Sequence, residues 1–142
     1  MRNMRKRKIY IAGPMTGIAR WNRPAFVKAA RQLRELGWEV ESPVEIADAF
    51  GNQNTIVTTP GLLDTVIDEE LAQLAKCDAI YLLEGWENSR GAKTELLLAL
   101  EKGMDVITER SGVVYYTPKA ALEVALMDPI TVNPKMNVKV EK

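Results

Sequence analysis

The sequence predicts a single α/β domain in which helices flank a parallel sheet. Its 142 residues suit one domain with a sizeable core. Short strand-like runs alternate with helical segments along the chain, an order that is typical of parallel strands joined by right-handed crossovers. The run DAIYLL at 78–83 is nearly all apolar, and such strands belong to sheets that are covered on both faces.

The first elements are predicted from turn residues and spacing. The β-rich run 8–13 ends at a glycine and a proline, which predicts a strand and then a turn. Within 23–37, apolar residues at helical spacing follow a proline and precede a glycine, which predicts a helix with both ends marked. A second strand is expected at 38–42. Residues 43–60 are predicted to form a long loop, which in a compact domain is usually functional or mobile.

The second half of the chain continues the alternation. Residues 62–75 place apolar side chains on one helical stripe, and 78–83 give the third strand. A helix is then expected at 92–102 and a fourth strand at 105–108. The sequence predicts a last helix that starts near Pro118.

Together these elements predict a Rossmann-like or flavodoxin-like domain over 8–128. A basic tail precedes it at 1–7, and an extended arm follows it at 129–142. We expect the tail to be solvated rather than to bind nucleic acid, because short charge runs usually face solvent.

The composition excludes several classes of function. Lys plus Arg equals Asp plus Glu, 19 against 19, which argues against nucleic acid or an anionic membrane as the main partner. No apolar run approaches the roughly 20 residues that a membrane span needs. The single cysteine, Cys77, excludes an intrachain disulfide and fits a reducing cytoplasm. The chain has no histidine, so any chemistry must use carboxylates, hydroxyls, Lys, Arg or backbone amides.

Two predicted strands end in unusual turns, at 13–17 and at 84–91. Ligands of open parallel sheets bind beyond the carboxyl ends of the strands, so both turns should border one crevice. At the second turn, Ser89 and Gly91 lie where the chain enters a helix, whose free N–H groups and dipole attract anions. Alternatively Ser89 is a simple helix cap, which is the commoner role for serine at such a position.

Two glutamates are the candidate reactive groups. Glu95 precedes the aliphatic run 96–100, and it is either an acid that favours the helix dipole or a carboxylate at the mouth of a pocket. In the second case we expect the helix end to hold its pKa low. Glu70 falls on the apolar stripe of its helix. Three roles are open there: it pairs with a basic side chain, it extends to solvent, or it points into the crevice as an acid. Two carboxylates beside an anion site suit cleavage at an anomeric carbon.

Two stretches resemble the nucleoside 2-deoxyribosyltransferase superfamily, KIYIAGPMTG at 8–17 and CDAIYLLEGWENSRGAKTELLLAL at 77–100. The resemblance covers residues 8–108 and is strongest to a small branch, common in phages and bacteria, that is described only as a domain of unknown function. Characterised relatives of this branch are 2′-deoxynucleoside 5′-phosphate N-hydrolases.

This resemblance implies a role for several residues. Glu95 stands where the family has the nucleophile that attacks C1′ of the deoxyribose, and Tyr10 lies beside it. Glu70 stands where an acid assists the base, although the family usually has aspartate there, and Asp68 and Glu69 are close neighbours. The candidate substrate-binding and phosphate-binding residues are those of the two turns: Gly13, Pro14, Met15, Thr16, Gly17, Trp86, Ser89, Arg90 and Gly91.

Some positions bear on the substrate. The N-hydrolases have an arginine in the first turn where this chain has Thr16, and Arg20 or Arg23 is a candidate replacement. Transferases of free nucleosides tend to have an aspartate six residues before the glutamate, where this chain has Ser89. Aspartate would repel a phosphate, whereas serine donates a hydrogen bond to it, so Ser89 favours a 5′-monophosphate.

Two tryptophans lie near the turns. Trp21 and Trp86 either stack on a base or anchor their loops, and most aromatic side chains serve packing.

The sequence therefore predicts an N-glycosidase that cleaves the base–deoxyribose bond of a 2′-deoxynucleoside 5′-monophosphate, with no metal or organic cofactor. A deoxyribosyltransferase or a nicotinamide-nucleotide glycohydrolase would use the same carboxylate chemistry. A non-catalytic protein that binds or sequesters nucleotides is the alternative from another class. The resemblance also implies a homodimer or a higher homo-oligomer, and nucleic acid and membranes are not expected as partners.

Overall fold

The computed structural model describes residues 6–116 and 138–139. Six strands form one sheet in the order β2-β1-β3-β4-β5-β6. The first four strands in this order run parallel: β2 (Glu39–Glu41), β1 (Lys8–Ala12), β3 (Ala79–Leu82) and β4 (Asp105–Arg110). The last two strands pair antiparallel at one edge: β5 (Val113–Tyr116) and β6 (Val138–Lys139).

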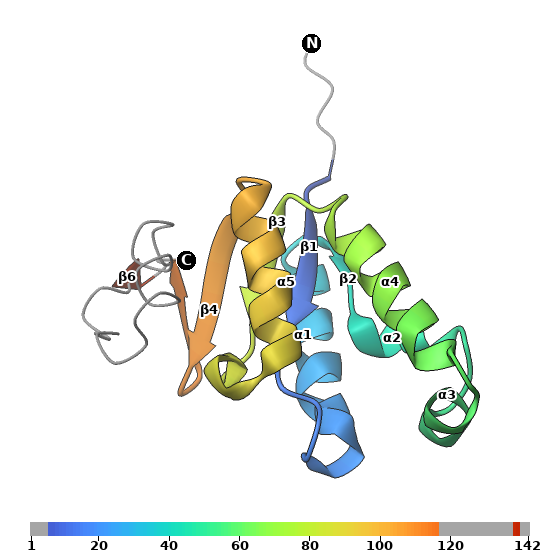
Figure 1. Cartoon of the computed structure of the whole chain (residues 1–142). Coiled ribbons are helices and arrows are strands. Elements are labelled where there is room, and N and C mark those ends of the chain that lie inside the picture. Colours follow the sequence, from blue (N-terminus) through green and yellow to red (C-terminus); the bar gives the residue numbers. More distant parts are fainter. Residues whose placement is uncertain (1–5, 117–137, 140–142) are drawn as a thin grey trace.

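The helices lie in the crossovers between the parallel strands (Figure 1). In chain order the helical elements are η1 (Ala19–Asn22), α1 (Arg23–Glu35), α2 (Pro43–Asp48), α3 (Gln53–Thr58), α4 (Leu62–Leu74), η2 (Trp86–Asn88) and α5 (Arg90–Glu101). The predicted α/β class is confirmed, and so are the four parallel strands.

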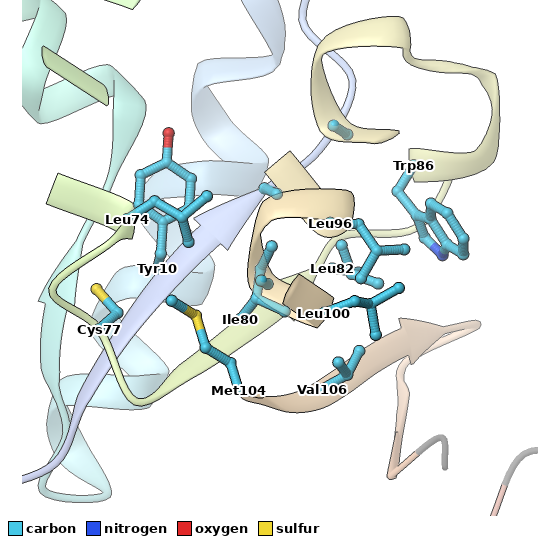
Figure 2. Close-up of a cluster of buried hydrophobic side chains, with 13 residues drawn as sticks. Tyr10, Leu74, Cys77, Ile80, Leu82, Trp86, Leu96, Leu100, Met104 and Val106 are labelled. Carbon is cyan, nitrogen blue, oxygen red and sulfur yellow. The ribbon is translucent and has the colours of Figure 1, made fainter. Parts of the chain in front are cut away.

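Each face of the sheet carries its own hydrophobic layer. Ile9 and Ile11 of β1 pack with buried residues of α1 and α2, whereas Tyr10 and Ala12 pack with those of α4 and α5. This division follows from the alternation of side chains along a strand. Figure 2 shows the second layer, in which Trp86 lies near aliphatic side chains of β3 and α5. Tyr10 therefore belongs to the face that α4 and α5 cover.

The prediction of a loop over 43–60 is wrong, because this stretch contains α2 and α3. Pro43 occupies the first turn of α2, where its missing N–H costs nothing. The side chain of Asn52 caps α3 by accepting a hydrogen bond from the N–H of Thr55 at 2.8 Å. Both helices have only six residues, too few to show a helical period in the sequence.

The antiparallel edge was also not predicted. β4 and β5 are joined by Ser111 and Gly112, whose φ angles of 51° and 76° suit a tight two-residue hairpin turn. Serine in the first position is a weak signal for such a turn, because asparagine and aspartate are the usual residues there. The helix expected near Pro118 lies outside the described residues, as do positions 1–5 of the tail and all of the arm except Val138–Lys139.

Candidate active site

A cleft of about 700 Å³ lies at the carboxyl ends of β1 and β3. Both turns that the sequence singles out border it, the first through residues 13–16 and the second through residues 88–91. Residues of α2, α3 and α4 line it as well. Figure 1 shows why these segments meet: α3 and the start of α4 lie at the same end of the sheet as the start of α5. The expectation that both turns share one crevice is confirmed.

Two carboxyl groups line this cleft, Glu95 from α5 and Glu70 from α4. Behind them, the fully buried Tyr10 donates a hydrogen bond from its hydroxyl to Oε2 of Glu95 at 2.6 Å. This contact joins residues that are 85 positions apart in the sequence. It fixes one carboxylate oxygen of Glu95 and leaves the other for a ligand.

The structure also decides which acid of α4 faces the cleft. Asp68 is exposed and does not line it. Glu69 accepts a hydrogen bond at 2.6 Å from the side-chain amide of Gln73, one turn further along the helix. Of the three neighbouring acids, Glu70 is the one that lines the cleft.

Burial raises the pKa of both glutamates. For Glu95, loss of water raises the pKa to about 8, the hydrogen bond from Tyr10 opposes this rise, and the nearby charge of Glu70 adds to it. Burial also raises the pKa of Glu70, to about 7. Groups that interact in this way titrate as a pair. Both shifts favour the protonated forms, so the pair is not fully ionised near neutral pH.

The expectation of a low pKa for Glu95 is wrong. α5 begins at Arg90, two residues before the expected start, so Glu95 is the sixth residue of the helix. The helix dipole acts mainly within the first turn. Desolvation in the second turn is the larger effect, and it favours the protonated form.

The start of α5 combines a cap with an open polar edge. The hydroxyl of Ser89 accepts a hydrogen bond from the N–H of Ala92 at 3.1 Å, so its role as a helix cap is confirmed. Ser89, Arg90 and Gly91 also line the cleft. The N–H groups of Arg90 and Gly91 have no carbonyl partner within the helix. A Cβ at Gly91 would meet nothing within 4 Å, so a ligand can approach this backbone closely.

Gly13 is required for packing. A Cβ at this position would lie 2.8 Å from Cβ of Leu83, closer than real contacts of this kind. The glycine therefore lets the turn after β1 lie directly against the chain that leaves β3. Gly17, the last residue of the same turn, has a φ of 80° and does not line the cleft. Its part is to allow the turn rather than to face a ligand.

Comparisons with known proteins place the chain in a family. The model for the domain of unknown function DUF4406 matches residues 7–108. The chain belongs to the DUF4406 family. A comparison with curated proteins found no match.

Among solved structures, the DUF4406 chain is similar to a 2-deoxyribosyltransferase from Bacillus psychrosaccharolyticus. The identity is 22%, the match covers 71% of this chain and 70% of that one, and the TM-score is 0.55. A conserved protein from Enterococcus faecalis V583 matches with 23% identity over 91% of this chain and 79% of that one, at a TM-score of 0.49. The first similarity shows that the DUF4406 chain has the deoxyribosyltransferase fold, and the resemblance found in the sequence is confirmed at this level.

The two tryptophans of the DUF4406 chain take different places. Trp86 does not line the cleft: it is 7% exposed and packs in the hydrophobic layer of Figure 2, beside Leu96 and Leu82. Its assignment to the substrate pocket is therefore corrected, because its large apolar surface gains more from burial against β3 and α5. Trp21 does line the cleft.

Trp21 is held there by an unusual stretch of backbone. Residues 20–22 have φ angles of 55°, 52° and 61°, a left-handed conformation that costs free energy for residues other than glycine. The side-chain amide of Asn22 donates a hydrogen bond to the carbonyl oxygen of Pro14 at 2.9 Å, which ties this stretch to the first turn.

Neither proposed replacement for the missing first-turn arginine lines the cleft. Arg23 pairs with Asp48 at 2.6 Å. Both Arg20 and Arg23 border a neighbouring hollow, which shares Met15, Trp21, Ala47 and Ile56 with the cleft. Within the described residues, Arg90 is the basic side chain that lines the main cleft. It is the candidate partner for an anionic group.

One side of the cleft was missed by the sequence analysis. Apolar residues from α2, α3 and α4 form it: Pro43, Ala47, Ile56, Val57, Leu63, Val66 and Ile67. The first four lie in the stretch that was predicted to be a loop. A signal existed on α4, where Glu70 shares the helical stripe of Leu63, Val66 and Ile67 and so indicates that this stripe faces a ligand as well as the core.

No group of three or more His, Cys, Asp and Glu side chains in residues 6–116 is placed to hold a metal ion. Among the helices that the structure describes, none is both long enough and apolar enough to cross a membrane.

The hydrogen bond from Tyr10 gives a prediction that does not depend on the function. In Tyr10→Phe the pKa of Glu95 should rise above about 8, because the hydroxyl that lowers it is gone. A ¹³C NMR titration of the glutamate carboxyl groups measures this, with the Glu95 signal assigned by its loss in Glu95→Gln. The control is Tyr81→Phe, which removes a hydroxyl that donates to Glu109 instead. An unchanged or lower pKa of Glu95 in Tyr10→Phe would contradict the assignment.

Proposed function

We propose that the chain is an N-glycosidase that cleaves the base–deoxyribose bond of a 2′-deoxynucleoside 5′-monophosphate. The observation that carries the proposal is the geometry of the cleft. Glu95, held by Tyr10 at 2.6 Å, lines it together with Glu70, and the open start of α5 borders the same space. The fold shared with a 2-deoxyribosyltransferase supports a reaction at the anomeric carbon of a deoxyribose.

In the proposed reaction the two carboxyl groups have different roles. The carboxylate of Glu95 attacks C1′, the bond from C1′ to the base nitrogen breaks, and the proton of Glu70 passes to the leaving base. Water then attacks C1′ of the sugar–Glu95 ester while the Glu70 carboxylate takes a proton from it. This step releases 2-deoxyribose 5-phosphate, and it restores the carboxylate of Glu95 and the acid form of Glu70.

The raised pKa values keep a proton on the pair near neutral pH. In the free chain this proton lies mainly on Glu95, because burial raises its pKa further than that of Glu70, to about 8 against about 7. The reaction needs one proton and one negative charge on the pair, a state that is most populated between the pKa values of about 7 and about 8. Positive charge that develops at C1′ favours the ionised form of the adjacent carboxyl group. In the transition state this charge therefore draws the negative charge onto Glu95 and leaves the proton on Glu70.

The phosphate is assigned to the start of α5. There the N–H groups of Arg90 and Gly91, the guanidinium of Arg90 and the hydroxyl of Ser89 border the cleft. Ser89 accepts from Ala92 with an oxygen lone pair, so its own hydrogen remains available to a phosphate oxygen. The positive end of the helix dipole adds to the attraction.

The test compares Ser89→Asp with Ser89→Asn. Both side chains cap a helix well, and they differ mainly in charge. Ser89→Asp should reduce kcat/KM for a deoxynucleoside 5′-monophosphate by about tenfold or more relative to the free deoxynucleoside, because like charges repel. Ser89→Asn should change this ratio little. Chromatography of the released base measures both, and base release from deoxynucleosides but not from monophosphates would refute the proposal.

A deoxyribosyltransferase is the second candidate, since a protein of the same fold bears that name. Adding an acceptor base to the reaction separates the two: transfer gives a new nucleotide, whereas hydrolysis gives free 2-deoxyribose 5-phosphate. Tight nucleotide binding without base release, unchanged in Glu95→Gln, would instead indicate a sequestering protein.

The proposal also includes a homodimer or higher homo-oligomer, a cytoplasmic location and a domain over 8–128. Light scattering coupled to size-exclusion chromatography measures the assembly, and a monomeric mass would contradict that part.

A further inference from the structure

The cleft has one side of mixed character, to which Pro14, Met15 and Trp21 also contribute, and one side that is apolar. Thr16, Asn88, Ser89 and Arg90 supply polar side chains around the start of α5 and the first turn. Across from them stands the apolar wall, which consists of Pro43, Ala47, Ile56, Val57, Leu63, Val66 and Ile67. Among the described residues of α2, α3 and α4 that line the cleft, Glu70 is the one with a hydrogen-bonding side chain.

The apolar wall is not simply an edge of the core. Val57, Leu63 and Ile67 are 53%, 43% and 42% exposed, although each lines the cleft. Exposed apolar side chains gathered in a cleft are typical of a binding surface. Because Leu63, Ile67 and Glu70 are spaced by four and three residues on α4, the wall leads directly to one of the two carboxyl groups.

We propose, on the basis of the proposed function, that the apolar wall receives the nucleobase and favours an apolar 5-substituent on it, thymine above uracil. A nucleotide has a charged phosphate at one end and a base with apolar faces at the other. With the phosphate at the start of α5 and C1′ at Glu95, the base extends toward α4. Glu70, the polar side chain next to this wall, is engaged with the leaving nitrogen of the base. The wall therefore distinguishes one base from another by the area of apolar contact and not by hydrogen bonds to the edge of the base.

The expected preference is modest, as it is for any selection by apolar contact. Burial of one additional methyl group favours thymine over uracil by about fourfold in affinity. A hydroxymethyl group of similar size should lose this advantage, because its hydroxyl finds no partner on the wall.

The test measures binding, so that it does not require turnover. Calorimetry gives the Kd of dUMP, dTMP and 5-hydroxymethyl-dUMP for Glu95→Gln. The order should be dTMP tightest, with about a fourfold gap to dUMP. Adding Leu63→Gln or Ile67→Gln to this variant should bring the ratio of the Kd values of dUMP and dTMP close to one. The matched control is Leu97→Gln on α5, which is 54% exposed and outside the cleft and should leave the gap unchanged.

Two wall variants are used because either one alone could disturb α4, and circular dichroism identifies a variant that does not fold. Equal Kd values for dUMP and dTMP would overturn the inference, as would a gap that both folded wall variants retain. A change in oligomeric mass without a change in the gap would also overturn it, by showing that the wall packs against a second copy.

The inference and the proposed function can fail separately. If wild type releases no base but the Kd gap is present and is removed by the wall variants, the inference stands and the glycosidase proposal falls. If base is released with no preference in Kd, the inference alone falls. If no nucleotide binds, both fall.

Discussion

Glu95→Gln is expected to reduce base release by roughly four orders of magnitude, comparable to the loss of other catalytic nucleophiles. The amide keeps the size of the side chain and can still accept the hydrogen bond from Tyr10, but it cannot attack C1′. Glu70→Gln should cost less, about a hundredfold or more, because it removes only the proton transfer to the base and from water.

Glu101→Gln serves as the control for this measurement. It makes the same chemical change at the exposed last residue of α5, outside the cleft, and should leave the rate unchanged. Steady-state rates of base release, read by chromatography, compare the three variants. A rate for Glu95→Gln within tenfold of wild type would show that Glu95 is not the reacting group.

The second large effect is on stability. Glu95→Gln should stabilise the fold at pH 9 by roughly 2–4 kcal/mol and much less at pH 5. The pKa of Glu95 is about 8 in the folded chain and near its ordinary value of 4.5 in the unfolded chain. Between these values the folded state binds more protons, so stability falls as the pH rises through this window. Glutamine does not ionise, so the variant lacks the free-energy cost of a buried, charged carboxylate at high pH.

Urea denaturation at pH 5 and pH 9 measures this difference in the free energy of unfolding. Glu101→Gln is again the control, and its difference between the two pH values should match that of wild type. If Glu95→Gln is destabilised equally at both pH values, the burial of a carboxylate at this position is not costly, and the raised pKa is refuted. Acids kept in a desolvated cleft at the expense of stability are typical of reactive sites.

Much of the site could be predicted from the sequence because of one topological rule. Loops that follow neighbouring parallel strands meet at the same edge of the sheet, so the turns after β1 and β3 were expected together and are found together. The contact between Tyr10 and Glu95 follows from the same frame, since strand alternation puts Tyr10 under α5. That Tyr10 contacts Glu95 in particular was indicated by the family resemblance and not by the spacing of residues in the sequence.

Other features depend on packing that no local pattern records. Trp86 and Trp21 both lie beside turns, and only the three-dimensional structure shows that one is buried while the other lines the cleft. The pKa of Glu95 depends on the helix starting at Arg90 and on how completely α4 and the first turn exclude water. The apolar wall was missed because α2 and α3 are too short to be recognised by periodicity.

The most direct test of the central claim is to trap the sugar on Glu95. A nucleoside 5′-monophosphate with fluorine at C2′ of the sugar should form the ester quickly enough to be seen and hydrolyse slowly, because fluorine destabilises the positive charge that water attack requires. Mass spectrometry of the digested protein should then show one fluorinated sugar phosphate on the peptide that contains Glu95, and none in Glu95→Gln. Release of base with the adduct on another residue, or with no adduct at all, would contradict the account.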